Sequence, residues 1–364
     1  MDTLTDNGFV QNLFDQVLSS KNNTSNTFIS PTSIISLLKL LELCSKGQTK
    51  EQIKSVVHSE NSSCFNSDKK ENGIFFEANG LFLDFSFPLN ELNVYKIKER
   101  VHVTVKSLNF QKFPKKCRKK INDLVEKLTE NKIKDMLKQN IVNKDTSMIV
   151  FNALYFNFYW DTPFNKLLTK KSKFTCLCGK ESTIDIMGLK RIFFVNHNKH
   201  LGIRCLQIPF KGNRFAMVLF LPDKNINFEN TIKKLRIKDM EKLITNSVEM
   251  EVLLKLPKFK AKCELDNLSK ILKNLGVTDM FNFKTANFKK ISHADELFVS
   301  DVIHTSFVEI NERGAEAASC TAAVATFSGP YIPTPTFVCD RPFLFTIRNN
   351  YNKNILFFGK VINL

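Results

Sequence analysis

The spacing of apolar residues changes along the chain, from a helical period in the first third to extended runs afterwards. Residues 30–58 carry apolar side chains at helical spacing, and Ser30 followed by a proline is a favourable helix start. Gly47 is expected to end this helix, and Thr49 with Gln52 matches a capping box for a second one. The pattern therefore predicts two consecutive helices.

Most of the remaining chain has the short apolar runs that are typical of strands. Residues 122–137 have the amphipathic spacing of a further helix. The predicted strands are 74–83, 148–158, two within 202–222 around a turn at 211–213, 249–260, 299–310, and a hairpin of 344–347 with 355–361. The run at 148–158 is almost wholly apolar, as in a strand buried on both faces. No repeat or long linker divides the chain, so the sequence predicts one α+β domain over residues 1–364.

The segment 311–325 has small residues at alternate positions, among them Ala315, Ala317 and Ser319. Residues two apart share one face of a strand, so this segment could enter a packed sheet with small side chains inward. The alternative is an Ala-rich surface helix followed by a linker. Residues 327–335 contain three prolines and cannot form a central strand, which makes them an accessible target for a protease.

Composition narrows the class of protein without choosing a function. The chain has 364 residues, 43% of them hydrophobic, and a formal net charge of +17, which favours polyanionic partners. Neither a signal peptide nor an apolar run of transmembrane length is found, and nine scattered cysteines are typical of reduced cytosolic thiols. Cys176 and Cys178 have the wrong spacing for a zinc site, so we expect no metal and no cofactor.

A set of short motifs resembles the serpin family almost from end to end, in the family's order and at its spacings. The motifs are residues 26–34, 122–133, 152–156 with Trp160 and Phe164, 206–212, 256–259, 275–277 with Phe281, 299–304, 340–345 and 355–361. The resemblance implies helices packed around three β-sheets, with an exposed reactive-centre loop at about residues 312–337. It also implies a monomeric protease inhibitor rather than an enzyme, with no catalytic residues of its own.

The resemblance further implies a mechanism that depends on the segment after Arg313. A native serpin is metastable, and after a protease cuts the loop, the loop inserts into the main sheet and the protease stays attached as an acyl-enzyme. Insertion needs a hinge of small residues without proline. The hinge expected here is Gly314, Ala315, Glu316, Ala317, Ala318, Ser319, Cys320 and Thr321, with Glu316 facing outward and Ala315 at a position where inhibitory members more often have Thr or Ser.

The resemblance places the cut at one of two neighbouring bonds. The usual count from Glu312 gives Ser328–Gly329, and a loop one residue shorter gives Phe327–Ser328, which we favour because an aromatic side chain fills a chymotrypsin-like pocket. The expected partner is therefore a chymotrypsin-like serine protease. Two alternatives stay open: a non-inhibitory serpin-fold binding protein that uses its basic surface, and an inhibitor of a cysteine protease. A caspase is disfavoured because no Asp lies near the cut.

The resemblance also assigns structural roles to polar residues around the main sheet. Ser30, Ser33, Asn152, His304 and Trp160 match the regions called the shutter and the breach. His304 is expected to be a buried structural residue, hydrogen-bonded to Ser33 or Asn152, and not a catalytic base.

The strongest basic cluster comprises Lys115, Lys116, Arg118, Lys119 and Lys120. It is either a solvated helix face or a site for a polyanion, with a glycosaminoglycan favoured over nucleic acid because no aromatic residues alternate with the basic ones.

The chain departs from the family in one connection, which runs from the second predicted helix to the strand that begins at residue 74. This connection is too short to contain helix D, the helix that other members have there. Together with the missing signal peptide and a composition rich in Lys, Asn, Phe and Ile, this resembles the intracellular serpins of poxviruses. The sequence therefore predicts a cytoplasmic viral protein, in the host cytosol, that modulates host defence, has no membrane association and could leave the cell by a non-classical route.

Overall fold

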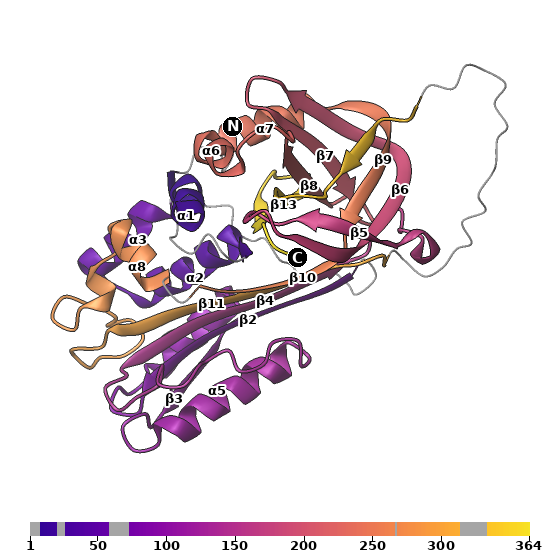
Figure 1. Cartoon of the computed structure of the whole chain (residues 1–364). Coiled ribbons are helices and arrows are strands. Elements are labelled where there is room, and N and C mark those ends of the chain that lie inside the picture. The colour runs from indigo at the N-terminus through magenta and orange to yellow at the C-terminus, as the bar shows by residue number, and fades with distance from the viewer. Residues whose placement is uncertain (1–7, 20–25, 58–72, 266–267, 314–332) are drawn as a thin grey trace.

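The structure is a computed structural model that describes residues 8–19, 26–57, 73–265, 268–313 and 333–364 (Figure 1). Its helices are α1 (Gly8–Ser19), α2 (Pro31–Cys44), α3 (Gly47–Val56), α4 (Glu91–Arg100), α5 (Pro114–Leu128), α6 (Phe228–Lys234), α7 (Ile237–Thr245) and α8 (Leu268–Asn274), with 3₁₀ turns at Lys166–Leu168 and Asp279–Phe281.

The strands form two hydrogen-bonded networks. They are β1 (Thr27–Ile29), β2 (Gly73–Asp84), β3 (Thr104–Leu108), β4 (Met148–Phe158), β5 (Lys170–Thr175), β6 (Glu181–Asn198), β7 (Ile203–Pro209), β8 (Phe215–Pro222), β9 (Val248–Pro257), β10 (Phe259–Leu265), β11 (Val299–Ile310), β12 (Thr336–Val338), β13 (Phe343–Asn349) and β14 (Ile355–Val361).

The first network is a five-stranded sheet in the order β10-β11-β4-β2-β3. Its central strand β4 is buried at every position, as its apolar run predicts. One face of β4 presents residues such as Val150 and Leu154 to the core that also contains α2, and the other presents Ile149 and Phe151 to the core beneath α5. Figure 1 shows α2 and α5 on opposite sides of this sheet. The sheet is therefore a layer between helices, with α5 as its outer cover.

The second network runs in the order β1-β14-β13-β8-β7-β6-β9-β12, and β5 also pairs with β6. The long strand β6 pairs with β5 over residues 181–186 and with β9 over residues 186–195. It pairs with β7 only near its end, over residues 194–198. β6 thus joins two layers, and counting them separately gives the three sheets of the predicted α+β fold.

The predicted helix over 122–137 is wrong at both ends. α5 begins at Pro114, which occupies the first turn, where proline fits because its missing N–H is not needed. It ends at Leu128 because Glu130 and Asn131 adopt left-handed φ angles of 47° and 61°. The chain then folds back on α5, and the Asn122 side chain accepts from the N–H of Leu137 at 2.8 Å and donates to its carbonyl oxygen at 3.1 Å.

The capping box is also wrong. α3 begins at Gly47, so Thr49 lies inside it and its hydroxyl accepts from the N–H of Asn287 at 3.0 Å. The Gln52 side chain accepts from the N–H of Asp279 at 2.9 Å. Both side chains therefore hold a distant loop rather than the end of their own helix.

The predicted strand over 249–260 is two strands. β9 ends at Pro257 and β10 begins at Phe259, and the two belong to different sheets. The strands predicted at 148–158 and 299–310 are confirmed without change, and those at 74–83, within 202–222 and in the final hairpin are confirmed with ends shifted by a few residues.

Candidate functional site

The segment 314–332 connects the two sheets, and its two attachment points are described. The chain leaves the five-stranded sheet after β11 at Arg313 and returns at Pro333, just before β12 on the edge of the other sheet (Figure 1). The predicted hinge, from Gly314 to Thr321, and the predicted cut at Phe327, Ser328 or Gly329 lie outside the described residues.

The first attachment point is held by a buried carboxylate. The Glu312 side chain is only 6% exposed and lies 3.0 Å from the Nζ of Lys258, and it accepts from the Thr169 hydroxyl at 3.0 Å. Burial would raise the pKa of this carboxyl, but the backbone N–H of Glu312, followed by Lys258 and Thr169, favours the charged carboxylate and holds the pKa below the ordinary value. The contacts tie the end of β11 to the residue between β9 and β10. Sequence reasoning gave no role to Lys258 or Thr169, because neither lies near Glu312 in the chain.

Trp160 contacts the residues that follow the same end of β11. Its Nε1 donates to the carbonyl oxygen of Asn311 at 2.8 Å, and its ring stacks on Phe210 with the centroids 4.6 Å apart. The N–H of Trp160 donates to the Arg313 carbonyl oxygen at 3.3 Å. Trp160 is almost fully buried, so these bonds are shielded from water. The residue predicted for the breach therefore contacts the chain immediately before the loop.

His304 lies in the middle of β11, opposite Asn152 of β4, and is completely buried. The N–H of Ser30 donates to its Nε2 at 3.4 Å, so Nε2 is the unprotonated nitrogen of the ring. Its Nδ1–H then donates to Oδ1 of Asn152 at 2.9 Å. Burial lowers the pKa of His304 to about 3, because the charged imidazolium would be desolvated. A neutral ring bridges β11 to β4 and to the start of α2.

The amide of Asn152 extends this network to β2. It donates to the side chain of Asn79 at 2.8 Å and to Glu77 at 3.3 Å, and burial raises the pKa of Glu77. Sequence reasoning missed Glu77 and Asn79. The signal was available, because both are polar residues on the strand face that also presents Leu81 to the core.

The structure shows one of the two alternative partners predicted for His304. Asn152 is one, whereas Ser33 is not, because its hydroxyl donates to the Ser30 carbonyl oxygen at 3.1 Å and its N–H donates to the Ser30 hydroxyl at 3.3 Å. Ser30 caps α2 with its side chain and reaches His304 with its backbone N–H. The Ser33 hydroxyl already donates to the Ser30 carbonyl oxygen, which explains the difference.

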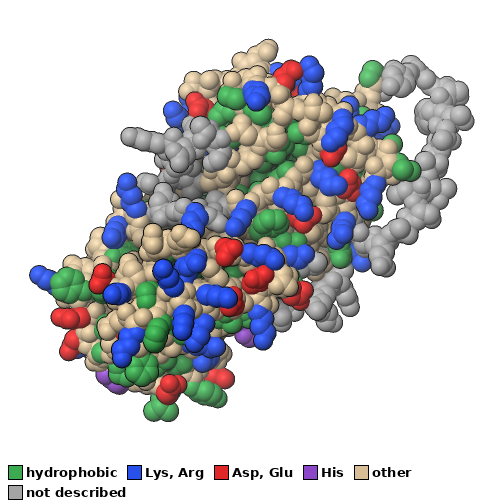
Figure 2. Space-filling view, turned by 60° about the horizontal axis from the view of Figure 1, so that its bottom comes forward, with side chains coloured by type: hydrophobic (Ala, Val, Ile, Leu, Met, Phe, Trp, Pro, Cys, Tyr) green, Lys and Arg blue, Asp and Glu red, His purple; other side chains and the backbone are tan. Residues whose placement is uncertain are grey.

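The predicted basic cluster occupies the first two turns of α5. Lys115, Lys116, Lys119 and Lys120 are exposed, and none of them has a salt bridge to a carboxylate in the part of the chain that the structure describes. Arg118 is half-buried and donates to the Leu137 carbonyl oxygen at 3.0 Å. Figure 2 brings the α5 side of the molecule forward and shows many Lys and Arg side chains on this face. The cluster is an unneutralised positive surface on the helix that covers the five-stranded sheet.

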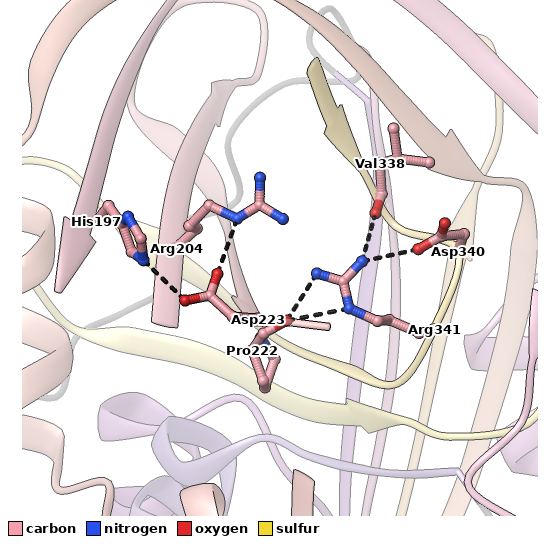
Figure 3. A network of polar contacts seen from close by, with 7 residues as sticks. All are labelled: His197, Arg204, Pro222, Asp223, Val338, Asp340 and Arg341. Atoms are coloured by element: carbon pink, nitrogen blue, oxygen red, sulfur yellow. Dashed lines mark hydrogen bonds and ion pairs between the residues drawn. The ribbon is translucent and has the colours of Figure 1, made fainter. Parts of the chain in front are cut away.

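Beyond β12, the returning chain is held by Arg341 (Figure 3). Its guanidinium donates to the Pro222 carbonyl oxygen from Nη2 at 2.7 Å and from Nε at 3.1 Å, and to Asp340 at 2.8 Å. Beside it, Asp223 lies 2.9 Å from His197 and 3.3 Å from Arg204. These contacts fasten the chain after β12 to the end of β8. The chain is therefore anchored at Glu312 and Trp160 before the segment 314–332, and at Arg341 after β12.

Metal and membrane sites were also considered. Over the described ranges, no three His, Cys, Asp or Glu side chains come together as a metal site would need. None of the described helices is both long enough and apolar enough to cross a membrane.

Comparison with known proteins agrees with this arrangement. The family model described as "Serpin (serine protease inhibitor)" matches residues 5–364. The human leukocyte elastase inhibitor is 34% identical over 360 residues, covering 94% of each chain, and human serpin B3 is 32% identical over 380 residues, covering 97% of this chain and 96% of that protein.

Two solved structures have the same fold over nearly their whole length. Uncleaved ovalbumin has a TM-score of 0.89 and 25% identity, covering 99% of this chain and 100% of its own. Native protease nexin-1 with heparin has a TM-score of 0.86 and 27% identity, covering 100% of this chain and 98% of its own. The chain therefore belongs to the serpin family, described as serine protease inhibitors, and its relatives are inhibitors rather than enzymes.

Proposed function

We propose that this protein is a suicide substrate of a chymotrypsin-like serine protease, which is trapped when the cleaved loop inserts into the five-stranded sheet. The observation that carries the proposal is the direct pairing of β11 with β4. The two strands are parallel and in register, with His304 opposite Asn152. A strand that turned back after β11 would run antiparallel to both, and it could hydrogen-bond to each of them.

The sequence of the hinge supports insertion at this position. Positions 315, 317, 319 and 321 are Ala, Ala, Ser and Thr, so one face of the inserted strand would be small throughout. Glu316 would lie on the opposite face. No proline interrupts the hinge, so each N–H is available for the ladder.

The chemistry is supplied by the protease. Its serine attacks the carbonyl carbon of Phe327, an ester forms between the two residues, and the amino group of Ser328 leaves. Insertion of the new N-terminal part of the loop then carries the esterified protease away before water can hydrolyse the ester. Phe327 suits an apolar S1 pocket. Cleavage at Ser328–Gly329 is the alternative and would change the expected protease class.

The polar contacts around β11 take on roles in this scheme. The His304–Asn152 bond spans the two strands that must separate, so it acts as a shutter that opens during insertion. The contacts of Glu312 and Trp160 hold the end of β11 and form the breach where insertion starts. Because these bonds stabilise the closed sheet, they set a barrier to insertion before cleavage.

A trapping experiment with matched variants tests the proposal. Wild-type protein is incubated with chymotrypsin and with cathepsin G, and is analysed by denaturing gel and by the mass of the released C-terminal peptide. We expect an SDS-stable complex and a peptide that starts at Ser328. Ala317→Arg should be cleaved without forming a complex, because a large charged side chain would have to enter the sheet. Glu316→Arg, one residue away on the outward face, is the control and should still trap.

Each outcome decides between the open alternatives. Trapping by Ala317→Arg equal to the wild type would contradict insertion. Clean cleavage of the wild type by every serine protease tried, with no gain in heat stability afterwards, would favour the non-inhibitory binding protein. A complex with a cysteine protease only would change the target class, and a peptide that starts at Gly329 would move the cut to Ser328.

We also propose that the basic cluster on α5 binds a sulfated polyanion, which the unpaired charges of Lys119 and Lys120 favour. Replacing both with Gln should lower the salt concentration that elutes the protein from heparin–agarose. The control replaces Lys96 and Lys98, two exposed lysines of α4, with Gln. Equal shifts for both pairs would mean that net charge alone governs binding, and stronger retention on DNA than on heparin would favour nucleic acid.

The proposed location is the cytosol, and the proposed source is viral, with host defence as the process affected. The location is supported by the nine scattered cysteines, and the source by the Lys-, Asn-, Phe- and Ile-rich composition. Fractionation of producing cells, with the protein detected by antibody, tests the location directly.

A further inference from the structure

Two exposed apolar side chains lie side by side on the outer face of the β6–β9 ladder. Ile192 and Phe194 of β6 are 59% and 48% exposed, and alternate positions place them on one face. Their cross-strand partners are Glu251 and Glu249 of β9. Lys190 continues the face and lies 3.1 Å from Glu251. These five residues are called the β6–β9 strip below.

The neighbouring part of the same face is covered by helix α7. Asn196, the next residue along this face of β6, donates to the Leu243 carbonyl oxygen of α7 at 3.0 Å. Gln207, which pairs with Phe194 from β7, donates to the Ile244 carbonyl oxygen at 3.1 Å. The helix therefore stops beside the strip, and the apolar side chains of the strip stay in solvent at an unfavourable free energy of hydration.

The strip lies at the end of the ladder from which the chain returns out of the reactive loop. Leu253 of β9 donates its N–H to the Pro335 carbonyl oxygen at 2.9 Å, and Thr336 pairs with Leu253. Because β12 is parallel to β9, the chain approaches Thr336 from the side of Glu249 and Glu251 (Figure 1). The strip is thus next to the second attachment point of the loop.

Chain length limits how far a docked protease can be from the strip. The eight residues from Ser328 to Pro335 are joined by seven peptide links and span at most about 25 Å when fully extended. A protease domain of roughly 230 residues has a radius of gyration of about 17 Å, and so a face on the order of 40 Å across. That face reaches about 20 Å from the cut bond, so a protease that leans toward Pro335 brings its rim over the strip.

We propose that the β6–β9 strip is a second contact surface for the target protease when it docks at the reactive bond. This inference rests on the proposed function and specifies its partner further. The strip is complementary to an apolar patch bordered by basic residues on the protease, because Glu249 and Glu251 flank its apolar pair. These carboxylates stand out in a chain whose net charge is +17. It would select among proteases that accept the same residue at the cut.

The test compares the double variant Ile192→Ser/Phe194→Ser with Leu92→Ser as the matched control. Leu92 is 78% exposed and lies on α4, which packs against α2 rather than belonging to the β6–β9 ladder. The rate constant for cleavage of the loop is measured for chymotrypsin, cathepsin G and leukocyte elastase, alongside hydrolysis of a free peptide with the sequence 320–334. We expect the double variant to be cleaved roughly tenfold more slowly than the wild type by at least one protease. The rate for the free peptide, which lacks the strip, reports how well each protease accepts the loop sequence alone.

The outcomes separate this inference from the function on which it rests. Loop cleavage is measured whether or not the protease is trapped, so a wild type that is cleaved without a complex overturns inhibition but still reports docking at the strip. Equal rate constants for the double variant and Leu92→Ser with all three proteases would overturn the inference. Self-association of the wild type in sedimentation, lost in the double variant, would assign the strip to a second copy instead and would also overturn it.

Discussion

The buried histidine at the centre of the five-stranded sheet predicts how stability changes with pH. His304 has a pKa near 3 in the folded protein and an ordinary value of 6.5. A folded pKa below the unfolded one means that the unfolded chain binds the proton more tightly, so the stability that the neutral ring contributes is present above pH 6.5 and is lost as the pH falls toward 3. Between pH 7.5 and pH 5.0 the loss is about 2 kcal/mol, at about 1.4 kcal/mol for each pH unit below 6.5.

The variant His304→Gln isolates this contribution, because glutamine does not titrate but can still donate and accept hydrogen bonds. Denaturant unfolding is followed through Trp160, which is the only tryptophan of the chain and is buried. The wild type should lose about 2 kcal/mol more than the variant on going from pH 7.5 to pH 5.0. A lower stability of the variant at both pH values, from imperfect packing, would not affect this difference.

The control is His200→Gln, which removes an exposed histidine and should retain the wild-type pH dependence. The reasoning would be refuted by a His304→Gln protein whose stability falls as steeply as that of the wild type. Unfolding at each pH must be shown to reverse on dilution, since otherwise the midpoint reports a rate rather than a free energy.

Two further predictions follow from the packing of the same sheet and from its attachment to the loop. Glu312→Gln removes the charge that faces Lys258 and should lower stability by about 1 kcal/mol, a modest value because Lys258 is partly exposed. Thermal unfolding followed by Trp160 fluorescence measures the loss of stability. Lys260→Gln is the control, because it breaks a more exposed ion pair, and equal melting temperatures for Glu312→Gln and the wild type would contradict the prediction. Gly80→Ala places a methyl group 2.1 Å from the Phe151 ring and should cost roughly 1–3 kcal/mol, whereas Gly188→Ala, whose nearest neighbouring atom would be 3.9 Å away, should cost much less. Thermal unfolding of the two glycine variants is followed by circular dichroism. Similar melting temperatures for the two would contradict the expected clash between the new methyl group and the Phe151 ring.

Local sequence determined those features that depend on local spacing. The apolar run at 148–158 predicted a strand covered on both faces, and β4 has those limits. Alternation fixed which residues of each strand face the core, since side chains two apart share a face. Helix limits were less certain. The start of α5 at Pro114 was missed because its first two turns are basic rather than amphipathic, and its end depends on a chain reversal held by Asn122 and Leu137.

The tertiary structure alone decided which distant residues meet. His304 is 152 residues from Asn152 and 274 from Ser30, and Lys258 is 54 from Glu312. Spacing carries no information on such pairs, because they form only when strands from different parts of the chain take one register within a sheet. The exposure of Ile192 and Phe194 was equally hidden, since residues 192–195 are all apolar, as in a strand covered on both faces, and only the position of α7 leaves that face open. The sequence determined the periods, the burial and the small hinge residues, whereas packing decided the partners of each polar side chain.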